Sequence, residues 1–381
     1  MYDDMPPERA AIVEAVRDFA NAELAPNAAS WDAQKFFPVD TLKRAGKLGL
    51  GGIYVREEVG GSALSRLDAL AIFEELAKGD TTIAAYISIH NMVVWMIDTF
   101  GTDEQRNQWI PSLARMHDLG SYCLTEPGAG SDAAAITTSA RREGDEYVIN
   151  GVKQFISGAG SSAVYLVMAR TGEPGSRGIS AILVPAGTPG LSFGPNEKKM
   201  GWNAQPTRQV IFEDVRVPIA HRLAEEGQGF HIAMQGLNGG RVNMGACSLG
   251  GAQWALERTV NYVRERQAFG GPLAEQQSVV FTLADMETDL QAARAVLQRA
   301  ATKMDHKAPD LVAACALAKR FATDAAFRVA NAALQLHGGY GYLQEYGIER
   351  VVRDLRVHQI LEGTNEIMRV IVGRSLLEEK R

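Results

Sequence analysis

One carboxylate near the end of the chain is of a type that can do acid–base chemistry, and it lies at the end of an apolar run. Glu362 follows the apolar run VHQIL (residues 357–361) and precedes Gly363, within the stretch LEGTNEIMR. A carboxyl group shielded by apolar neighbours has a raised pKa and is then a base strong enough to remove a weakly acidic proton. The same letters also fit an ordinary helix boundary, with Gly363 as the break and Thr364 or Asn365 as the next cap. Taken alone, the stretch favours the helix boundary.

Two glycine-rich stretches have backbones that allow close approach to a ligand. In YCLTEPGAGSD (122–132), the glycines of PGAG (127–130) let the backbone expose N–H groups to a planar ring or a phosphate. For PGAG alone an ordinary loop is the better explanation, whereas the whole eleven-residue string is far more specific. QLHGGYGY (335–342) follows an Ala-rich run, so it is either a helix end or a backbone wrapped against phosphates. His337 within it is interpreted as a structural hydrogen-bonding residue.

Two arginines need partners. Arg266 and Gln277 lie in RERQAFGGPLAEQQ (264–277), where the arginine either grips a pyrophosphate in bidentate fashion or belongs to a charged helix-to-loop connection. Arg241 lies in the otherwise uncharged LNGGRVNMGA (237–246) and requires an anionic or carbonyl partner. On local grounds we expect that partner to be an interdomain salt bridge.

The elements that position these residues fall into three zones, which we interpret as domains over 1–119, 120–231 and 232–381. The first has helical periodicity from Pro7, from Ser65 to Ala77 and again from Asp103. Between the last two, Thr81–Phe100 is strongly apolar but interrupted by polar residues. We therefore predict a buried helix there and no membrane span.

The middle zone is rich in Gly, Pro and β-branched residues. EYVI and VKQFI flank Asn150-Gly151, which predicts a hairpin with a type I′ turn at that dipeptide. Further strands are expected over 163–169, 179–184 and 209–212, typical of a small β-barrel or sandwich. The third zone has helical spacing over 283–304 and 311–333, which predicts a four-helix bundle. The fold class is therefore α+β multidomain, and not a doubly wound nucleotide fold.

Composition excludes several classes of protein. The chain has 381 residues, 45 acidic against 39 basic, and a net charge of -6, which argues against a nucleic-acid-binding surface. Three cysteines far apart suggest neither a disulfide framework nor a metal site. The N-terminus, MYDDMPPERA, has no apolar signal core and is not an Arg-rich transit peptide. We expect a bacterial cytoplasmic protein or a mature organellar form, such as one of the mitochondrial matrix.

Taken together, YCLTEPGAGSD, FISGAG, VIFEDVRVP, ERQAFGGPL, QLHGGYGY and LEGTNE resemble the acyl-CoA dehydrogenase family over essentially the full chain. The resemblance implies an N-terminal helical domain, a middle β domain and a C-terminal four-helix bundle. It also implies FAD as cofactor, an acyl-CoA thioester as substrate, a homotetramer, and reoxidation by an electron-transferring flavoprotein.

The resemblance also implies roles for individual residues. FAD would be bound in part from a neighbouring subunit, with Phe155 over one face of the ring system, where many relatives have Trp. The residues that match the family's FAD contacts are Tyr122, Cys123, Leu124, Thr125, Glu126, Pro127, Gly128, Ala129, Gly130, Ser131, Phe155, Ile156, Ser157, Arg266, Gln276, Gln277, Gln335, Leu336, His337, Gly338, Gly339, Thr364, Asn365 and Glu366. Those that match the path of CoA are Ser131, Asn238, Gly239, Gly240, Arg241 and Arg369.

The same resemblance answers the question raised by Glu362. It implies that Glu362 is the base, with its backbone N–H and a ribityl hydroxyl of FAD as donors to the thioester oxygen. Some relatives place the base just before the arginine that matches Arg241, but Gly240 occupies that position here. Two segments, SFGPNEKKMGWNAQPTR and VHQILEGTNEIMR, resemble the isobutyryl-CoA branch, which implies valine breakdown.

Several alternatives stay open at this point. If the reaction is an acyl-CoA dehydrogenation, 2-methylbutyryl-CoA and straight short-chain acyl-CoA are alternative substrates. The residues that we expect to line the acyl pocket are Tyr86, Asn91, Met92 and Gln359. An acyl-CoA oxidase is a rival, although the chain has no added C-terminal domain. A nitroalkane-oxidase-like enzyme would require Asp as its base, and here the position is Glu362. The alternative to an enzyme is a non-catalytic protein that binds flavin or CoA and acts only as an assembly partner. The intact Glu362 argues against it.

Overall fold

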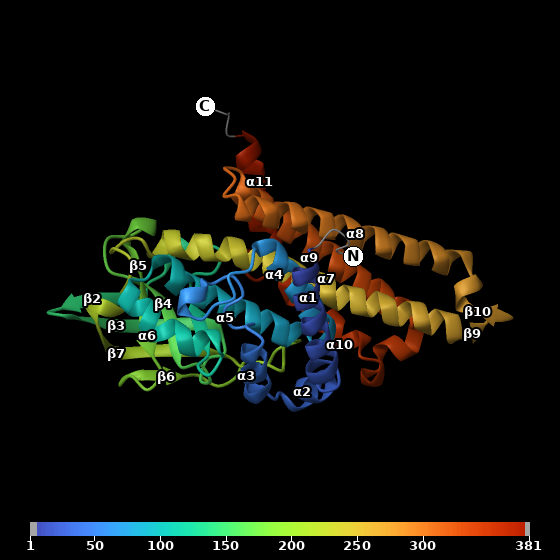
Figure 1. The fold of residues 1–381 in the computed structure, drawn as a ribbon, viewed down its shortest axis with the longest axis horizontal. Helices are drawn as coiled ribbons and strands as arrows, with labels where there is room; N and C mark the ends of the chain where they lie inside the picture. The colour runs from blue at the N-terminus through green and yellow to red at the C-terminus, as the bar shows by residue number, and fades with distance from the viewer. Residues whose placement is uncertain (1–5, 378–381) are drawn as a thin grey trace.

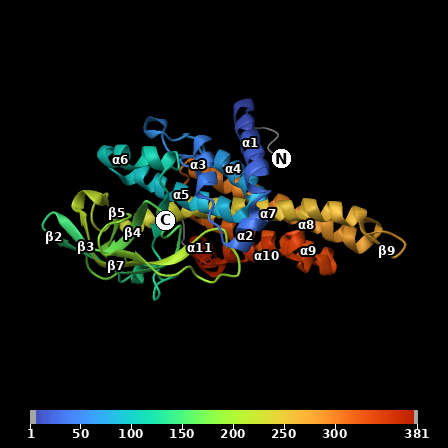
Figure 2. The same ribbon diagram turned by 90° about the horizontal axis from the view of Figure 1, so that it is seen from below.

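The computed structural model describes residues 6–377, so the first five and last four residues of the predicted terminal zones lie outside the described residues. Long C-terminal helices run along the molecule, N-terminal helices pack beside them, and a β-sheet lies at one end (Figures 1 and 2). This order of α, β and α segments is the predicted architecture.

Among the N-terminal helices, α4 (Arg66–Gly79), α5 (Thr81–Phe100) and α6 (Asp103–Ala114) begin at side-chain caps. Ser65 and Asp68 form a capping box at the start of α4, and Asp80 caps α5 by accepting a hydrogen bond from the N–H of Ile83. The helices of this region are α1 (Pro7–Phe19), a π-helical turn (Ala20–Leu24), α2 (Ala28–Gln34), α3 (Val39–Lys47), α4 (Arg66–Gly79), α5 (Thr81–Phe100) and α6 (Asp103–Ala114).

Helix α5 is the predicted apolar helix. Among the described helices it is the one long and apolar enough to cross a membrane. This is weak evidence for a span, because the core helix of a folded domain meets the same two criteria and most of α5 is buried. The structure therefore matches the predicted buried helix.

The middle strands join in one sheet. Their order is β6-β7-β3-β2-β4-β5-β8, and β1 pairs in parallel with β4, with Tyr122 opposite Leu166. The strands are β1 (Gly120–Cys123), β2 (Ser139–Glu143), β3 (Glu146–Ser157), β4 (Val164–Arg170), β5 (Ile179–Pro185), β6 (Leu191–Phe193), β7 (Thr207–Pro218) and β8 (Arg222–Leu223).

The predicted hairpin turn at Asn150-Gly151 is wrong. Both residues lie inside the continuous strand β3, and the turn falls at Gly144, which joins β2 to β3 and has a φ of 61°. Asn150 instead exchanges hydrogen bonds with Asp214 of β7. Gly151 is required for close approach, because a Cβ there would lie 2.6 Å from Thr138 Oγ1.

The C-terminal helices surround one long central helix. Helix α7 packs against α4, α5, α8, α9 and α10. The elements are α7 (Gly229–Glu265), a two-stranded hairpin of β9 (Gln267–Ala268) and β10 (Gly271–Pro272), α8 (Gln277–Asp305), α9 (Leu311–Leu336), α10 (Ile348–Arg356) and α11 (Asn365–Leu377). Short 3₁₀ turns cover Glu57–Val59, Ala133–Ala135, Ser176–Gly178, Ile219–His221, Leu273–Glu275, Gly338–Tyr342, Gln344–Tyr346 and Val357–Gln359.

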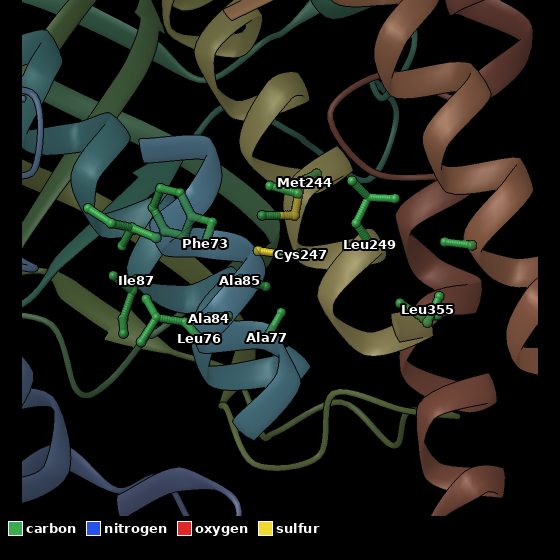
Figure 3. Close-up of a cluster of buried hydrophobic side chains, with 14 of the residues drawn as sticks. Phe73, Leu76, Ala77, Ala84, Ala85, Ile87, Met244, Cys247, Leu249 and Leu355 are labelled. Atoms are coloured by element: carbon green, nitrogen blue, oxygen red, sulfur yellow. The ribbon is translucent and has the colours of Figure 1, made fainter. Parts of the chain in front are cut away.

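The core between the two helical regions is continuous. Figure 3 shows Met244, Cys247 and Leu249 of α7 between Phe73 and Ala85 of the N-terminal helices on one side and Leu355 of α10 on the other. Cys123, Cys247 and Cys315 are buried free thiols, as expected for small apolar residues. The packing fixes α7 as the rigid element against which the C-terminal turn is placed.

Candidate active site

The turn that holds Glu362 is also a helix boundary, as its sequence suggested. The N–H of Leu361 donates to the carbonyl of Val357, and Thr364 Oγ1 accepts from the N–H of Ile367 at 3.3 Å to cap α11. Between these two points Glu362 and Gly363 have φ angles of 55° and 94°. A left-handed conformation at a glutamate is uncommon and is strained, which suggests that the turn is shaped for function.

Two cationic side chains hold the carbonyls of this turn. Arg241 Nε of α7 donates to the carbonyl of Glu362 at 3.2 Å, and its Nη1 donates to Asn238 Oδ1 at 2.9 Å. Lys319 Nζ of α9 donates to the carbonyl of Gly363 at 2.9 Å. Arg241 therefore finds the carbonyl partner that the sequence allowed, and not the interdomain salt bridge that we favoured on local grounds.

The Glu362 carboxyl is shielded from water at one oxygen. Its Oε2 atom is buried and has no hydrogen-bond partner among the described residues. Burial raises the pKa of Glu362 to about 7, and the positive charges of Lys319 and Arg241 oppose that rise. Burial also lowers the pKa of Lys319 to about 8. A carboxyl with this pKa holds or releases a proton near neutral pH, as a general base must.

The carboxyl lies directly against Gly240. A Cβ built at Gly240 would lie 2.4 Å from Glu362 Oε2 and 2.7 Å from its Cδ, so no larger residue fits there without moving the acid. One helix residue away, a Cβ at Gly239 would lie 2.7 Å from Arg66 Nη1. The predicted glycine pair is therefore a flat surface on α7 that lets the acid and an arginine approach the backbone.

An aromatic and polar wall, which the sequence did not indicate, lies beside this surface. The Arg66 guanidinium lies 3.5 Å from the centre of the Tyr54 ring and 5.1 Å from that of Trp95. The Tyr54 hydroxyl accepts a hydrogen bond from Asn243 Nδ2 at 3.2 Å. Burial raises the pKa of Tyr54, and Glu362 adds to that rise, which places the phenol near the acid.

Strand β1 brings the first glycine-rich loop to the same region. The Tyr122 hydroxyl is buried without a partner among the described residues, and its pKa is raised by burial and by the Glu362 carboxylate. The N–H of Gln154 donates to the carbonyl of Thr125 at 2.8 Å, so Phe155 lies beside the start of the loop. Phe155 has a φ of 60° and a side chain that is 62% exposed. An exposed aromatic ring at a strained position is a surface for a planar ligand.

Two predicted contact residues on this loop turn their side chains inward. Cys123 lies in the core of the β domain. The Glu126 carboxylate pairs with the buried Lys153 at 2.8 Å and accepts from the N–H groups of Thr137 and Thr138. These two residues have only main-chain atoms to offer a ligand. Ser157 lies in β3, where its carbonyl accepts from Ser121 Oγ at 2.6 Å.

The other predicted cofactor residues gather at the opposite end of the long helices, beside β9 (Figures 1 and 2). A cavity of about 400 Å³ there is lined in part by Arg266, Tyr262 and the run from Gln335 to Tyr340. The His337 ring stacks on Tyr262 at 4.3 Å, and its Nδ1 bonds the carbonyl of Ala333, which is the predicted structural role. Gln276 and Gln277 begin α8. A single chain therefore does not bring the predicted cofactor residues near Phe155 together with those near Arg266.

The remaining predicted contacts lie on α11. The Asn365 side chain is buried and bonds Lys319, Thr323 and Asp324, so it joins α11 to α9. Arg369 is half exposed and lies 3.4 Å from Glu366 and 3.6 Å from Asp324. Glu366 is exposed, as the helix-boundary reading of the stretch required.

The four candidate pocket walls are used mainly for support. The amide of Asn91 bonds the backbone of Leu50, Ile53 and Ile87. The Tyr86 ring packs edge-on against Phe37. Gln359 donates to Asp324, and Met92 is a core residue. Lys319 was missed although it had a visible signal, because it is the first charged residue after the apolar, Ala-rich run 311–318.

Comparison with known proteins identifies the relatives of this site. Family models for the acyl-CoA dehydrogenase N-terminal, middle and C-terminal domains match residues 6–117, 121–215 and 227–377. The chain belongs to the acyl-CoA dehydrogenase family. Mitochondrial isobutyryl-CoA dehydrogenase of Bos taurus is 55% identical over 95% of this chain and 87% of that protein.

Solved structures agree with this assignment. Butyryl-CoA dehydrogenase of Megasphaera elsdenii has a TM-score of 0.95 at 38% identity, with 98% of this chain and 99% of that one covered. A chain from structural work on the electron transferring flavoprotein of Acidaminococcus fermentans has a TM-score of 0.97 at 38% identity, with both chains covered in full. The acyl-CoA dehydrogenase fold, with its N-terminal helical, middle β and C-terminal helical domains, is thus the predicted one.

Proposed function

We propose that this acyl-CoA dehydrogenase uses FAD to oxidise isobutyryl-CoA to methacrylyl-CoA, a step of valine breakdown. The observation that carries the proposal is the Glu362 carboxyl, shielded at Oε2 and set against Gly240. The choice of acyl chain is supported by the 55% identity to an isobutyryl-CoA dehydrogenase, against 38% for a butyryl-CoA dehydrogenase. The alternatives of 2-methylbutyryl-CoA and straight short chains become outcomes of the substrate test.

Glu362 performs the proton step in this proposal. Its carboxylate removes a proton from the carbon next to the thioester carbonyl, and burial makes it basic enough to do so. The N–H of Glu362 donates to the thioester oxygen and stabilises the charge that develops there. Arg241 and Lys319 hold the carbonyls of Glu362 and Gly363, which directly follow this N–H and carboxyl in the chain, so they help to orient both groups.

The residues present fit FAD at two places. Phe155 would stack on the ring system beside Thr125 and Ser157, and the loop from Pro127 to Ser131, which is exposed except at Ala129, would follow it. Arg266 would bind the pyrophosphate of FAD from a second copy of the chain, across the cavity that Gln335–Tyr340 line. The chemistry that bound FAD supplies is acceptance of the hydride from the β carbon.

The proposal includes partners and a location. Two copies at least are needed to complete one cofactor site, and we propose a homotetramer. The family resemblance supports an electron-transferring flavoprotein as acceptor. The Bos taurus relative is mitochondrial, and we propose the bacterial cytoplasm or the mitochondrial matrix for this chain.

Replacement of the base tests the proposal. We expect Glu362→Gln to purify as a yellow protein and to lose reduction by isobutyryl-CoA by roughly a thousandfold or more, since the variant has no base. The measurement is anaerobic bleaching of the flavin absorbance. Glu14→Gln, on an exposed face of α1, is the matched control and should bleach like the parent. Retained turnover in Glu362→Gln would overturn the assignment.

A further inference from the structure

A buried histidine lies four residues before the base and joins three elements. His358 is fully buried, and its ring lies edge-on to Trp202 at 5.4 Å. Trp202 Nε1 donates to His358 Nε2 at 3.2 Å, and His358 Nδ1 lies 2.7 Å from Ser248 Oγ. The Ser248 hydroxyl donates in turn to the carbonyl of Met244 at 2.8 Å.

These contacts fix one state of the imidazole. An indole N–H is a donor and never an acceptor, so His358 Nε2 must accept and Nδ1 must carry the hydrogen. Burial, with a further contribution from the charge of Lys319, lowers the pKa of His358 to about 3. The ring is therefore neutral through the working pH range, with both nitrogens occupied. It does not exchange protons with the substrate.

The partners of His358 come from distant parts of the chain. Trp202 lies in the segment between β6 and β7, and its backbone N–H donates to Asp354 Oδ1 of α10 at 2.6 Å. Ser248 lies on α7, seven residues and therefore two helical turns after Arg241, on the same side of the helix. Helix α7 thus contacts the turn of the base twice, through Arg241 at Glu362 and through Ser248 at His358.

We propose that His358 is a positioning residue for the base: its ring clamps the turn of Glu362 between α7 and the Trp202 segment. Arg241 and Lys319 hold the carbonyls of Glu362 and Gly363, at the end of the turn. His358 is the matching attachment at its beginning. With both ends held, the strained pair Glu362–Gly363 keeps the carboxyl against Gly240. The inference rests on the proposed function of Glu362.

Three replacements of His358 separate its two hydrogen bonds. His358→Asn places an amide N–H near the position of Nδ1, so it keeps the bond to Ser248 and loses the one to Trp202. His358→Gln places an amide oxygen near Nε2 and does the reverse, whereas His358→Ala loses both. Displacement of a catalytic group by about 1 Å costs up to roughly a hundredfold in rate. We expect kcat to fall roughly tenfold to a hundredfold in His358→Ala and less in the two amides, with KM changed by less than about threefold.

A matched control separates positioning from stability. His221 also lies edge-on to a tryptophan, Trp109, at 5.6 Å, and its Nδ1 bonds the carbonyl of Leu183 at 3.1 Å. His221→Ala therefore removes a similar contact in the β domain. We expect it to lower the melting temperature while kcat and the midpoint of the pH profile stay at the parent values. In the His358 variants that midpoint should move, because the carboxyl is no longer held in its shielded place.

Amide hydrogen exchange measures how firmly the turn is held, without any need for turnover. In the purified holoenzyme, the peptide covering 357–364 should exchange at least about tenfold faster in His358→Ala than in the parent or in His221→Ala. Parent-like exchange, kcat and pH midpoint in His358→Ala would overturn the inference. If no thioester reduces the parent protein, the proposed function fails, and the exchange experiment alone then decides whether the turn is clamped.

Discussion

Among individual residues, Glu362 shows how opposing effects set the pKa of a carboxyl to about 7. Burial moves the pKa of Glu362 upward, whereas Lys319 and Arg241 restrain it. Without burial the acid would be too weak a base, and without the cations it would stay protonated at neutral pH. The rate should therefore rise with pH through about 7, because the ionised carboxylate is the active form.

Lys319→Met tests this balance. Lys319 lowers the pKa of Glu362, so its removal should raise that pKa further and move the rising limb of the kcat/KM profile to higher pH by roughly one unit. The measurement is the pH profile of isobutyryl-CoA oxidation. Lys47→Met, at the exposed end of α3, is the control and should not move the limb. If the rising limb of the kcat/KM profile stays in place or moves to lower pH in Lys319→Met, the lysine does not lower the pKa of Glu362.

At the scale of the element, periodicity predicted the helices well because their buried faces repeat along the chain. The apolar spacing of 283–304 and 311–333 falls within α8 and α9. The dipeptide Asn150-Gly151 led to a wrong prediction of a turn, because turn preferences consider only neighbouring residues. Gly151 is instead needed because Thr138, which is distant in sequence, packs against its backbone. The turn at Gly144 has no Asn before it and carried a weaker signal.

A pair of glycine replacements tests this correction. Gly144→Ala should destabilise by about 1 kcal/mol, because its φ is positive but space is open around it. Gly151→Ala adds a clash with Thr138 to an unfavourable φ of 145° and should cost roughly 2–4 kcal/mol. Urea unfolding of both variants gives the comparison. Equal costs would mean that Gly151 is needed for its backbone alone.

Elements also explain what the sequence left hidden. The carboxyl and its glycine surface were predictable because motif letters mark them. Lys319 reaches a carbonyl 44 residues away, Ser248 reaches a ring 110 residues away, and Asn243 reaches a phenol 189 residues away. The first two contacts are made by the packing of α9 and α7 against the C-terminal turn, and the third by the packing of α7 against the N-terminal region. Local sequence patterns do not show which distant groups these side chains reach.

At the scale of the whole molecule, the two halves of the proposed cofactor site lie at opposite ends of the long helices. Assembly should therefore stabilise FAD binding, and dilution should release FAD together with subunits. Arg266→Gln removes the guanidinium from the cavity beside Tyr340. We expect it to weaken FAD binding by roughly 1.5–3 kcal/mol, the range for a charged hydrogen bond. Flavin fluorescence during dilution measures this loss.

Arg264→Gln is the control for that experiment, because Arg264 is exposed two residues earlier in α7. It removes the same charge from the same region of the surface. Its FAD affinity should match that of the parent. Equal weakening in both variants would mean that the effect is general electrostatics, and FAD retention by isolated subunits of the parent would contradict the shared site.

An anaerobic titration of the yellow protein with isobutyryl-, 2-methylbutyryl-, butyryl- and isovaleryl-CoA, followed by flavin absorbance, tests both the role of Glu362 and the choice of acyl chain. We expect isobutyryl-CoA to bleach the flavin at the lowest concentration of the four thioesters. Preference for butyryl-CoA would keep the base and overturn the substrate. If none of the four thioesters bleaches the yellow protein, Glu362 is not the base of an acyl-CoA dehydrogenation, and the residue is then no more than the end of a helix.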